Sequence, residues 1–384
     1  MNILLISGDN SLLETNKETP NNTKYRMNLL SKDVSNLYIA VLTEENDKKK
    51  IIKLSNNLYI YSIPCKSKNP LKSIIKGYKI CSKICSDNHI HVMSVQEPFI
   101  MGFIGYLLKL MYKIPFNIQL HGDFIDNSWW IKQSKTRFFW NKWAKFVLKK
   151  ADTIRTVNPK IKKQLVGNGI KEKKIMDFPV FLDVNKFENC KKDLKDKFSN
   201  FDNIILFVGF LIPRKGVDVL INAFSLILEK FPNTLLLLVG DGPERTKLEN
   251  LSEKLNLSKN IIFEGNISHE DICAYFKLCN LFVLPSFSES WGRVVLEAMV
   301  FEKPVIVSNA CKIADLIQKS NSGLIFNVND PFSLSEKILY ILENEKSLEM
   351  GIQGKKIVKN EYSELAIVPK YKKLWEKTLK EVSN

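Results

Sequence analysis

The segment that decides the fold is residues 204–216, which read IILFVGFLIPRKG. Five consecutive apolar residues, a glycine, and then Arg214, Lys215 and Gly216 ahead of a helical pattern describe a buried strand that turns into a helix. Continuously apolar strands are typical of parallel sheets, which are covered on both faces. Because helix N-termini, Lys and Arg all favour anions, this turn is a candidate phosphate site.

Similar apolar runs recur along the whole chain, with helical patterns between them. The predicted strands are 2–7, 36–43, 57–64, 90–96, 116–121, 153–157, 175–180, 204–210, 234–240, 261–265, 281–286, 304–308 and 323–327. Alternation of strands and helices predicts doubly wound α/β sheets. These strands are too many for one ordinary open sheet, so the 384 residues predict two domains, with the polar, Lys-rich segment 183–203 as the linker.

The net charge of +16 is the unusual feature of the composition. The whole excess lies in residues 1–180, whereas residues 181–384 carry equal numbers of basic and acidic side chains. Such a balance indicates an anionic partner, which leaves nucleic acid, a membrane surface or a phosphorylated substrate open. The step in charge at mid-chain supports two domains with different partners.

Two basic stretches produce this excess. Between Asp47 and Asp87 there are ten Lys and no acid, and the pattern predicts an amphipathic helix with lysines on one face. Its predicted apolar face consists of Leu71, Ile74, Ile75, Tyr78, Cys81 and Cys85. Between Asp126 and Asp152 there are seven Lys or Arg and seven aromatic residues, and the tryptophans are Trp129, Trp130, Trp140 and Trp143. Cations interleaved with Trp are typical of a segment at an anionic membrane surface, and the alternative is a solvated helix face over an ordinary core.

The seven cysteines predict neither a disulfide framework nor a metal site. None forms a C-x-x-C pair, and no Cys/His cluster has zinc spacing, so we expect reduced thiols in a cytoplasmic protein. The N-terminus lacks the pattern of a signal peptide. The longest apolar stretch, 99–108, ends at Lys109 and is too short to span a bilayer. We therefore expect a soluble or peripheral protein, the latter on the inner face of the cell membrane.

The most informative block is PSFSESWGRVVLEAM at 285–299. Glu289 follows a predicted strand, at the end where α/β sheets bind ligands. Residues 292–295 begin a helix whose free N–H groups can accept a diphosphate, and Glu297 follows about a turn later. Carboxylates accept several hydrogen bonds from sugar hydroxyls. Taken alone, Glu289 is more readily explained as an exposed loop acid, and Glu297 as an acid that complements the helix dipole.

Together these motifs resemble the retaining glycosyltransferases of family 4, which have the GT-B fold. The resemblance rests on the glycine turn with Arg-Lys-Gly at 209–216, GDGPE at 240–244, the 285–299 block and Pro-Val-Ile-Val at 304–307. In the first half, IPFNIQLHGDF at 114–124 resembles the family's strand that ends in His-Gly. The segment KKADTIRTVNP at 149–159 resembles its A-D-x-I-x-x-V-S-x motif.

The resemblance implies two Rossmann-like doubly wound domains that face a central cleft. The implied acceptor-binding domain is 1–182, the nucleotide-sugar domain is 183–363, and 364–384 is a helix that crosses back to the first domain. His121, Glu289 and Lys215 would be catalytic. The implied donor-binding set is Gly8, Gly209, Arg214, Lys215, Ile267, Glu289, Ser290, Trp291, Gly292, Arg293, Val294 and Glu297.

The implied reaction moves a hexosyl group from a UDP- or GDP-linked sugar to a hydroxyl, with retention of configuration. Lys, Arg and a helix dipole would stabilise the departing nucleotide, so no metal and no cofactor are expected. The implied acceptor is a lipid-linked glycan of cell-surface polysaccharide or glycolipid biosynthesis, consistent with a basic, Trp-rich face on an anionic membrane.

Some positions depart from the family pattern. Phe210 stands where the family has a phosphate-contacting Arg, a charge that Arg214 or Arg293 could supply. Residues 7–10 read SGDN instead of a glycine pair, and Glu302 replaces a turn glycine. The alternatives are a non-catalytic GT-B partner subunit, or a sugar-nucleotide epimerase or phosphorylase of the same fold. Nucleic-acid binding is disfavoured because no nucleic-acid motif accompanies the charge.

Overall fold

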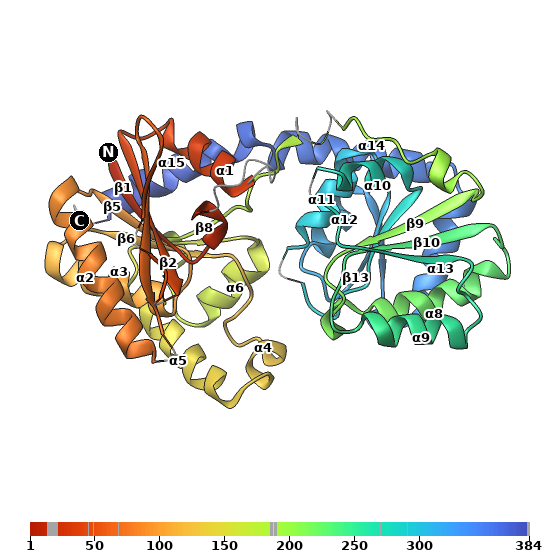
Figure 1. The fold of residues 1–384 in the computed structure, drawn as a ribbon, viewed down its shortest axis with the longest axis horizontal. Helices are drawn as coiled ribbons and strands as arrows, with labels where there is room; N and C mark the ends of the chain where they lie inside the picture. Colours follow the sequence, from red (N-terminus) through yellow and green to blue (C-terminus); the bar gives the residue numbers. More distant parts are fainter. Residues whose placement is uncertain are drawn as a thin grey trace. The chain divides into compact units, whose positions relative to one another are not determined.

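The computed structural model describes residues 1–381 except 14–21, 45, 49, 68, 185–186, 188–189, 269 and 290, with the side chains of Asn22 and Trp129 also left out. It divides into two compact units, each built on its own sheet (Figure 1). Unit 1 comprises Met1–Val180 and Ile367–Asn384, and unit 2 comprises Phe181–Ala366. For comparison, the segments expected from the sequence are 1–182, 183–363 and 364–384.

Unit 1 contains an eight-stranded sheet in the order β3-β4-β2-β1-β5-β6-β7-β8. Its strands are β1 (Asn2–Ser7), β2 (Asn36–Glu44), β3 (Ile51–Ser55), β4 (Leu58–Lys66), β5 (Val92–Val95), β6 (Phe116–Leu120), β7 (Thr153–Thr156) and β8 (Ile175–Asp177). Its helices are α1 (Asn22–Ser31), α2 (Pro70–Asn88), α3 (Ile100–Tyr112), α4 (Ser128–Lys132), α5 (Lys135–Lys150), α6 (Pro159–Gly167) and α15 (Glu364–Lys380), of which α15 enters the unit at Ile367. Seven strands are parallel and β3 pairs antiparallel with β4.

Unit 2 contains a six-stranded parallel sheet in the order β11-β10-β9-β12-β13-β14. Its strands are β9 (Asn203–Val208), β10 (Thr234–Val239), β11 (Ile261–Gly265), β12 (Leu281–Leu284), β13 (Val305–Ser308) and β14 (Gly323–Phe326). Its helices are α8 (Val217–Leu228), α9 (Arg245–Lys254), α10 (Ile272–Leu278), α11 (Arg293–Val300), α12 (Ala314–Ser320), α13 (Pro331–Glu343) and α14 (Lys346–Ile357).

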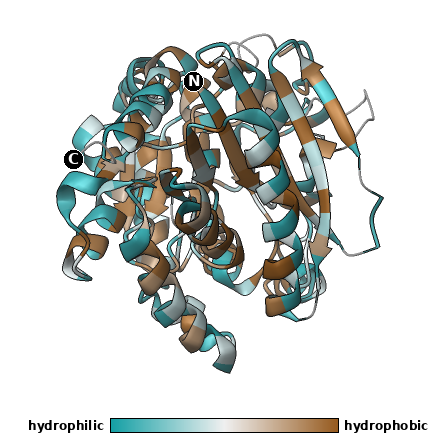
Figure 2. Cartoon of the chain, turned by 90° about the vertical axis from the view of Figure 1, so that its left-hand side faces the viewer, coloured by the Kyte–Doolittle hydropathy of each residue, from teal (hydrophilic) through white to brown (hydrophobic). Residues whose placement is uncertain are grey.

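The cores explain why these segments are strands and helices. Every residue of β10 and of β12 is buried, as a sheet covered on both faces requires. In Figure 2, which looks onto unit 1, the strands are largely hydrophobic, whereas the helices combine hydrophilic and hydrophobic residues. All thirteen predicted strands are confirmed within a few residues. The sequence analysis missed β3, because an edge strand with one neighbour has no fully buried residue to mark it.

The C-terminal helix packs into unit 1 from Ile367 onward. Trp375 is fully buried, and the hydroxyls of Thr378 and Thr153 lie 2.5 Å apart. The Tyr371 ring lies edge-on to Phe178 with their centroids 5.1 Å apart. Residues more than 200 positions apart in the chain thus share one core.

The expectation of seven reduced thiols was wrong for one pair. Cys190 and Cys273 form a disulfide across 83 residues, and the other five cysteines are buried thiols. The sequence gives no spacing signal for this pair, because only the fold brings the segment before β9 to the start of α10.

The predicted apolar face of α2 was partly wrong, since Leu71 and Ile75 are exposed while Ser73 and Gly77 are buried. Among the described residues, no helix is both long enough and apolar enough to cross a membrane.

Candidate functional site

The predicted donor residues of unit 2 gather at the carboxyl ends of its strands. From the central strand β9 the chain proceeds to β10 on one side, and it later returns to place β12 on the other side. The loops after β9 and β12 therefore flank the point where the strand order reverses, which is where open α/β sheets bind ligands. These loops are residues 209–216 and 285–292.

Glycines bring the loops at this edge into close contact. The Gly209 N–H donates to the Val239 oxygen at 2.9 Å. Gly240 has φ +131°, and a Cβ there would lie 2.0 Å from the Gly209 oxygen. Gly216 has φ +62°, and a Cβ there would lie 2.4 Å from the Pro285 oxygen. Any larger residue at 216 or 240 would force the loops apart, so the glycines position the cations that lie between them.

Lys215 and Glu289 form the centre of the candidate site. The Lys215 Nζ lies 2.6 Å from Glu289 Oε2, and their side chains are only 13% and 12% exposed. The Arg214 Nη1 lies 3.7 Å from the same carboxylate oxygen and donates to the backbone carbonyl oxygen of Ser288 at 2.7 Å. Two cations and one carboxylate thus converge from loops 74 residues apart. This arrangement can bind a phosphate and a hydroxyl side by side.

The start of α11 supplies backbone donors beside this pair. Gly292 is its N-cap with φ +72° and has no side chain that could cap the first N–H groups, while its carbonyl oxygen accepts from the Val295 N–H at 2.8 Å. One turn on, the Glu297 carboxylate is 7% exposed and lies 3.2 Å from Arg293 Nε. Burial raises the pKa of Glu297, and the Arg293 guanidinium opposes that shift.

Several buried donors around this helix start have no hydrogen-bond partner among the described residues, and they include Ser286 Oγ, Trp291 Nε1 and Arg293 Nη2. The Trp291 ring packs beside Tyr362 with a centroid distance of 5.6 Å. Buried donors are paired in most folded proteins, so a cluster of unpaired ones is consistent with a polar ligand.

Gly8 and His121 belong to unit 1. Gly8 follows β1, and a Cβ there would lie 2.8 Å from Met101 Cε, so the backbone approaches α3 closely. His121 follows β6 and is exposed. Desolvation and the guanidiniums of Arg155 and Arg26 lower the pKa of His121. This shift favours a neutral imidazole at pH 7.

The other predicted residues are less central. Ile267 follows β11 and packs against the unit 2 core, and Val294 is in the first turn of α11. Ser290 lies outside the described residues. Phe210 is 58% exposed and supplies no charge.

The sequence analysis missed two residues of the site. The backbone N–H of Lys312 donates to the backbone carbonyl oxygen of Glu289 at 3.0 Å, and the Tyr362 ring lies beside Trp291. No local motif marks either residue, because each reaches the site through tertiary contacts alone.

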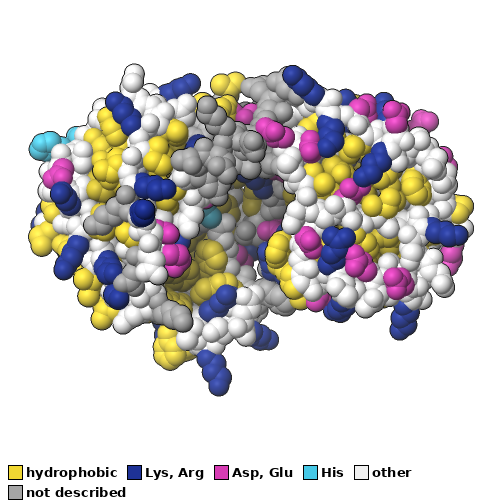
Figure 3. Space-filling view, in the orientation of Figure 1, with side chains coloured by type: hydrophobic (Ala, Val, Ile, Leu, Met, Phe, Trp, Pro, Cys, Tyr) yellow, Lys and Arg dark blue, Asp and Glu magenta, His cyan; other side chains and the backbone are white. Residues whose placement is uncertain are grey.

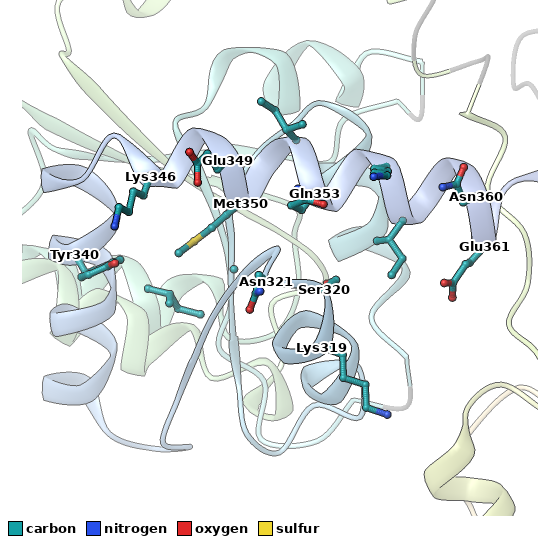
Figure 4. Close-up of a pocket in the computed structure, with 15 residues that line it drawn as sticks. Lys319, Ser320, Asn321, Tyr340, Lys346, Glu349, Met350, Gln353, Asn360 and Glu361 are labelled. Atoms are coloured by element: carbon teal, nitrogen blue, oxygen red, sulfur yellow. The ribbon is translucent and has the colours of Figure 1, made fainter.

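A cavity of about 810 Å³ in unit 2 lies elsewhere (Figure 4). It is lined by Lys319, Asn321, Gly323, Tyr340, Lys346 and Gln353 among others, from α12, α13, α14 and the start of β14. Gly323 is at the amino end of β14, whereas Lys215 and Glu289 follow the carboxyl ends of their strands. This cavity contains none of the predicted site residues.

Comparisons with known proteins identify the class. Residues 191–357 match the family described as glycosyl transferases group 1. The chain is 32% identical to an uncharacterized glycosyltransferase of Methanocaldococcus jannaschii over 86% of this chain and 87% of that protein. The chain belongs to the group 1 glycosyltransferases, and its two parallel-sheet units have the GT-B fold.

Two further comparisons are informative. N,N'-diacetylbacillosaminyl-diphospho-undecaprenol alpha-1,3-N-acetylgalactosaminyltransferase of Campylobacter jejuni is 27% identical over 93% of this chain and 96% of that protein. The crystal structure of Anabaena HepE in complex with UDP superposes with a TM-score of 0.76 at 16% identity and covers 97% of this chain and 99% of that one.

Proposed function

We propose that the protein is a retaining hexosyltransferase that moves a sugar from a UDP- or GDP-linked donor to a hydroxyl of a lipid-linked glycan. The observation that carries this proposal is the 2.6 Å pair of Lys215 and Glu289 at the strand-order reversal of unit 2. Lys215 and Arg214 would stabilise the departing diphosphate, and Glu289 would accept hydrogen bonds from the sugar hydroxyls. Glu297 would hold the ribose, and His121 would lie near the donor sugar.

A metal-independent mechanism is part of this proposal. The leaving nucleotide develops negative charge, which the two cations and the N-terminus of α11 can stabilise without a metal ion. Among the described residues, no three His, Cys, Asp or Glu side chains gather as a metal site requires. On this mechanism, activity should persist in excess chelator, and loss of transfer on chelation would refute this part of the proposal.

The donor class is supported by the Anabaena structure, which holds UDP, and the acceptor class by the Campylobacter relative, whose name specifies a diphospho-undecaprenol-linked sugar. A role in polysaccharide or glycolipid biosynthesis is supported by two other relatives, a capsular polysaccharide biosynthesis glycosyltransferase of Staphylococcus aureus and the alpha-monoglucosyldiacylglycerol synthase of Acholeplasma laidlawii. The acceptor would then lie at a membrane, and we place the protein in the cytoplasm on the inner face.

The surface of unit 1 supports peripheral membrane binding through phenylalanines of the basic aromatic stretch rather than through its described tryptophans. Trp130, Trp140 and Trp143 are half-buried, because they lie on the inner face of α4 and α5. Phe138 and Phe139 are 49% and 71% exposed instead, and Lys142 Nζ lies 4.7 Å from the centre of the Phe138 ring. Figure 3 shows Lys and Arg predominating over acidic side chains on unit 1, whereas acidic side chains are frequent on unit 2.

The test is a nucleotide-release assay over UDP-, GDP- and ADP-sugars, with a lipid extract as the acceptor. Glu289→Ala should abolish transfer while the fold stays intact, and Glu302→Ala is the matched control at an exposed acid. Unchanged activity in Glu289→Ala would refute the site. Donor binding without release, for every sugar and acceptor, would instead support the non-catalytic partner subunit.

Liposomes with anionic lipid test the membrane part of the proposal. They should sediment the protein at low salt and release it at high salt. Failure to sediment at low salt would refute peripheral binding.

A further inference from the structure

Unit 1 contains a cavity of about 660 Å³ that the donor chemistry does not use. Its floor comes from the carboxyl-end regions of three strands, with Leu42 in β2, Lys66 at the end of β4 and Glu97 just after β5. Its walls come from the starts of α3, α4 and α5, with Phe99, Met101, Trp130, Thr136, Arg137 and Trp140 among the lining residues.

The cavity lies beside the point where the strand order of the unit 1 sheet reverses. From β1 the chain proceeds to β2 on one side, and β5 pairs with β1 on the other side. Gly8 follows β1 at this point, and a Cβ there would lie 2.8 Å from Met101 Cε, an atom of the cavity wall residue. Open α/β sheets bind ligands at this position, so the cavity is placed where a substrate site belongs.

The wall of the cavity is an aromatic cluster. The Phe99 ring stacks on Trp130 with centroids 5.6 Å apart and meets Trp140 edge-on at 5.9 Å. All three residues are only half-buried, so parts of their surfaces remain open. Such a wall suits an apolar chain, because burying it releases water from the chain and from the rings together.

Two cationic side chains, Lys66 and Arg137, also line the cavity. The Arg137 guanidinium lies 5.0 Å from the centre of the Trp130 ring and donates to the Trp130 oxygen at 3.2 Å. Lys66 forms no ion pair with any described residue. Glu97, the one acid among the described lining residues, already accepts hydrogen bonds from the N–H groups of Phe99 and Met101 at 2.8 and 2.6 Å. Lys66 and Arg137 therefore leave the cavity with cationic donors that suit a phosphate.

Exposed apolar side chains continue outward from the cavity. Phe138 and Phe139 directly follow Arg137 in α5, and Leu71 and Ile75 flank the lining residue Ser73 in α2. Leu71 is 63% exposed and Ile75 is 48% exposed. In Figure 3 hydrophobic side chains gather in the lower part of this unit, with Lys and Arg beside them. These exposed apolar side chains, close in sequence to lining residues, favour an apolar chain that leaves the cavity toward a membrane.

We propose that this cavity binds the phosphate-bearing end of the isoprenoid lipid that carries the acceptor glycan. Lys66 and Arg137 contact the phosphate, and Phe99, Trp130 and Trp140 contact the first apolar units of the chain. This inference rests on the proposed function for the statement that the lipid carries the acceptor.

Equilibrium dialysis of the full chain with radiolabelled farnesyl diphosphate tests the cavity. The diphosphate should bind at least tenfold more tightly than farnesol, which lacks the phosphate, or inorganic pyrophosphate, which lacks the chain. Equal binding of farnesyl diphosphate and farnesol would overturn the proposal, because it would reflect general apolar adsorption. Equal binding of pyrophosphate would overturn it as well.

Matched variants locate the binding. Thr136→Trp places a large side chain at an exposed lining position and should weaken binding at least tenfold, whereas Lys135→Trp at its exposed neighbour should not. Lys66→Gln should weaken binding about fivefold or more, whereas Lys79→Gln on α2 removes the same charge outside the cavity and should leave it unchanged. Equal effects within either pair would overturn the assignment.

The same variants separate this inference from the proposed function. If sugar transfer is found but farnesyl diphosphate does not bind, the cavity assignment fails and the function stands. If farnesyl diphosphate binds in this pattern but no nucleotide sugar is used, the function fails and the lipid-phosphate site stands. Glu289→Ala should lose transfer and keep the binding of farnesyl diphosphate.

Discussion

At the scale of single residues, the first prediction concerns the positive charge that Phe210 does not supply. Arg214 Nη1 lies 3.7 Å from Glu289 Oε2, in the position to replace that charge. Arg214→Gln should lower the transfer rate on the order of 10²-fold, as removal of one oxyanion donor does. Phe210→Arg in the same chain should restore part of the loss.

Initial rates at saturating donor measure this effect. Lys230→Gln is the control, since it removes a surface cation that pairs with Glu343. If Arg214→Gln retains full activity, Arg214 does not supply the missing charge.

Glu97 predicts a pH effect on stability. Burial raises its pKa from 4.5 to about 7, against two backbone hydrogen bonds that lower it. Between these values the native state holds a proton that the unfolded state has lost, so the free energy of unfolding decreases as the pH rises through this window. Denaturant midpoints at pH 5 and 7.5 should differ less in Glu97→Gln than in the unaltered protein. Glu172→Gln, at an exposed acid, should leave the difference unchanged.

At the scale of elements, the turn from β9 into α8 depends on Gly216. Its φ of +62° and the 2.4 Å approach of a Cβ to the Pro285 oxygen make any side chain there strained. Gly216→Ala should lower the free energy of unfolding by about 2 kcal/mol or more and weaken donor binding. Gly167→Ala is the control, because a Cβ there meets nothing within 4 Å. Equal stabilities of the two variants in denaturant melts would contradict this account.

The Cys190–Cys273 disulfide joins the segment before β9 to α10 across 83 residues. Closing a loop of that length restricts the unfolded chain by about 4 kcal/mol in the chain-entropy model. Reductant should therefore lower the melting temperature of the unaltered protein and leave that of Cys273→Ser unchanged. Mass spectrometry after alkylation under denaturing conditions would show whether the two thiols are protected.

At the scale of the whole molecule, α15 belongs to unit 1 although it follows unit 2 in the sequence. Deleting residues 371–384 removes Trp375, which is fully buried, and the contact of Thr378 with Thr153. Calorimetry should then show loss or a large downward shift of one unfolding transition. Nucleotide binding by unit 2 should persist, and its loss would mean that the two units do not fold independently.

The sequence predicts those features that depend on residues close together in the chain. The thirteen apolar strands are local patterns and are confirmed. Leu71 and Ile75 were misplaced, because a helix with apolar residues on several faces does not show which face a neighbour covers. The exposed aromatics of α5 were misassigned to Trp for the same reason.

The sequence by itself determined the α/β class and the strand–turn–helix loops that carry Lys215, Glu289 and Glu297. It could do so because periodicity and turn chemistry act over a few residues. Only the tertiary structure decided that Lys215 meets Glu289 across 74 residues, that Cys190 meets Cys273, and that Lys66, Arg137 and an aromatic wall share one cavity. These contacts depend on the order of strands in the sheets, and no short stretch of sequence contains that order.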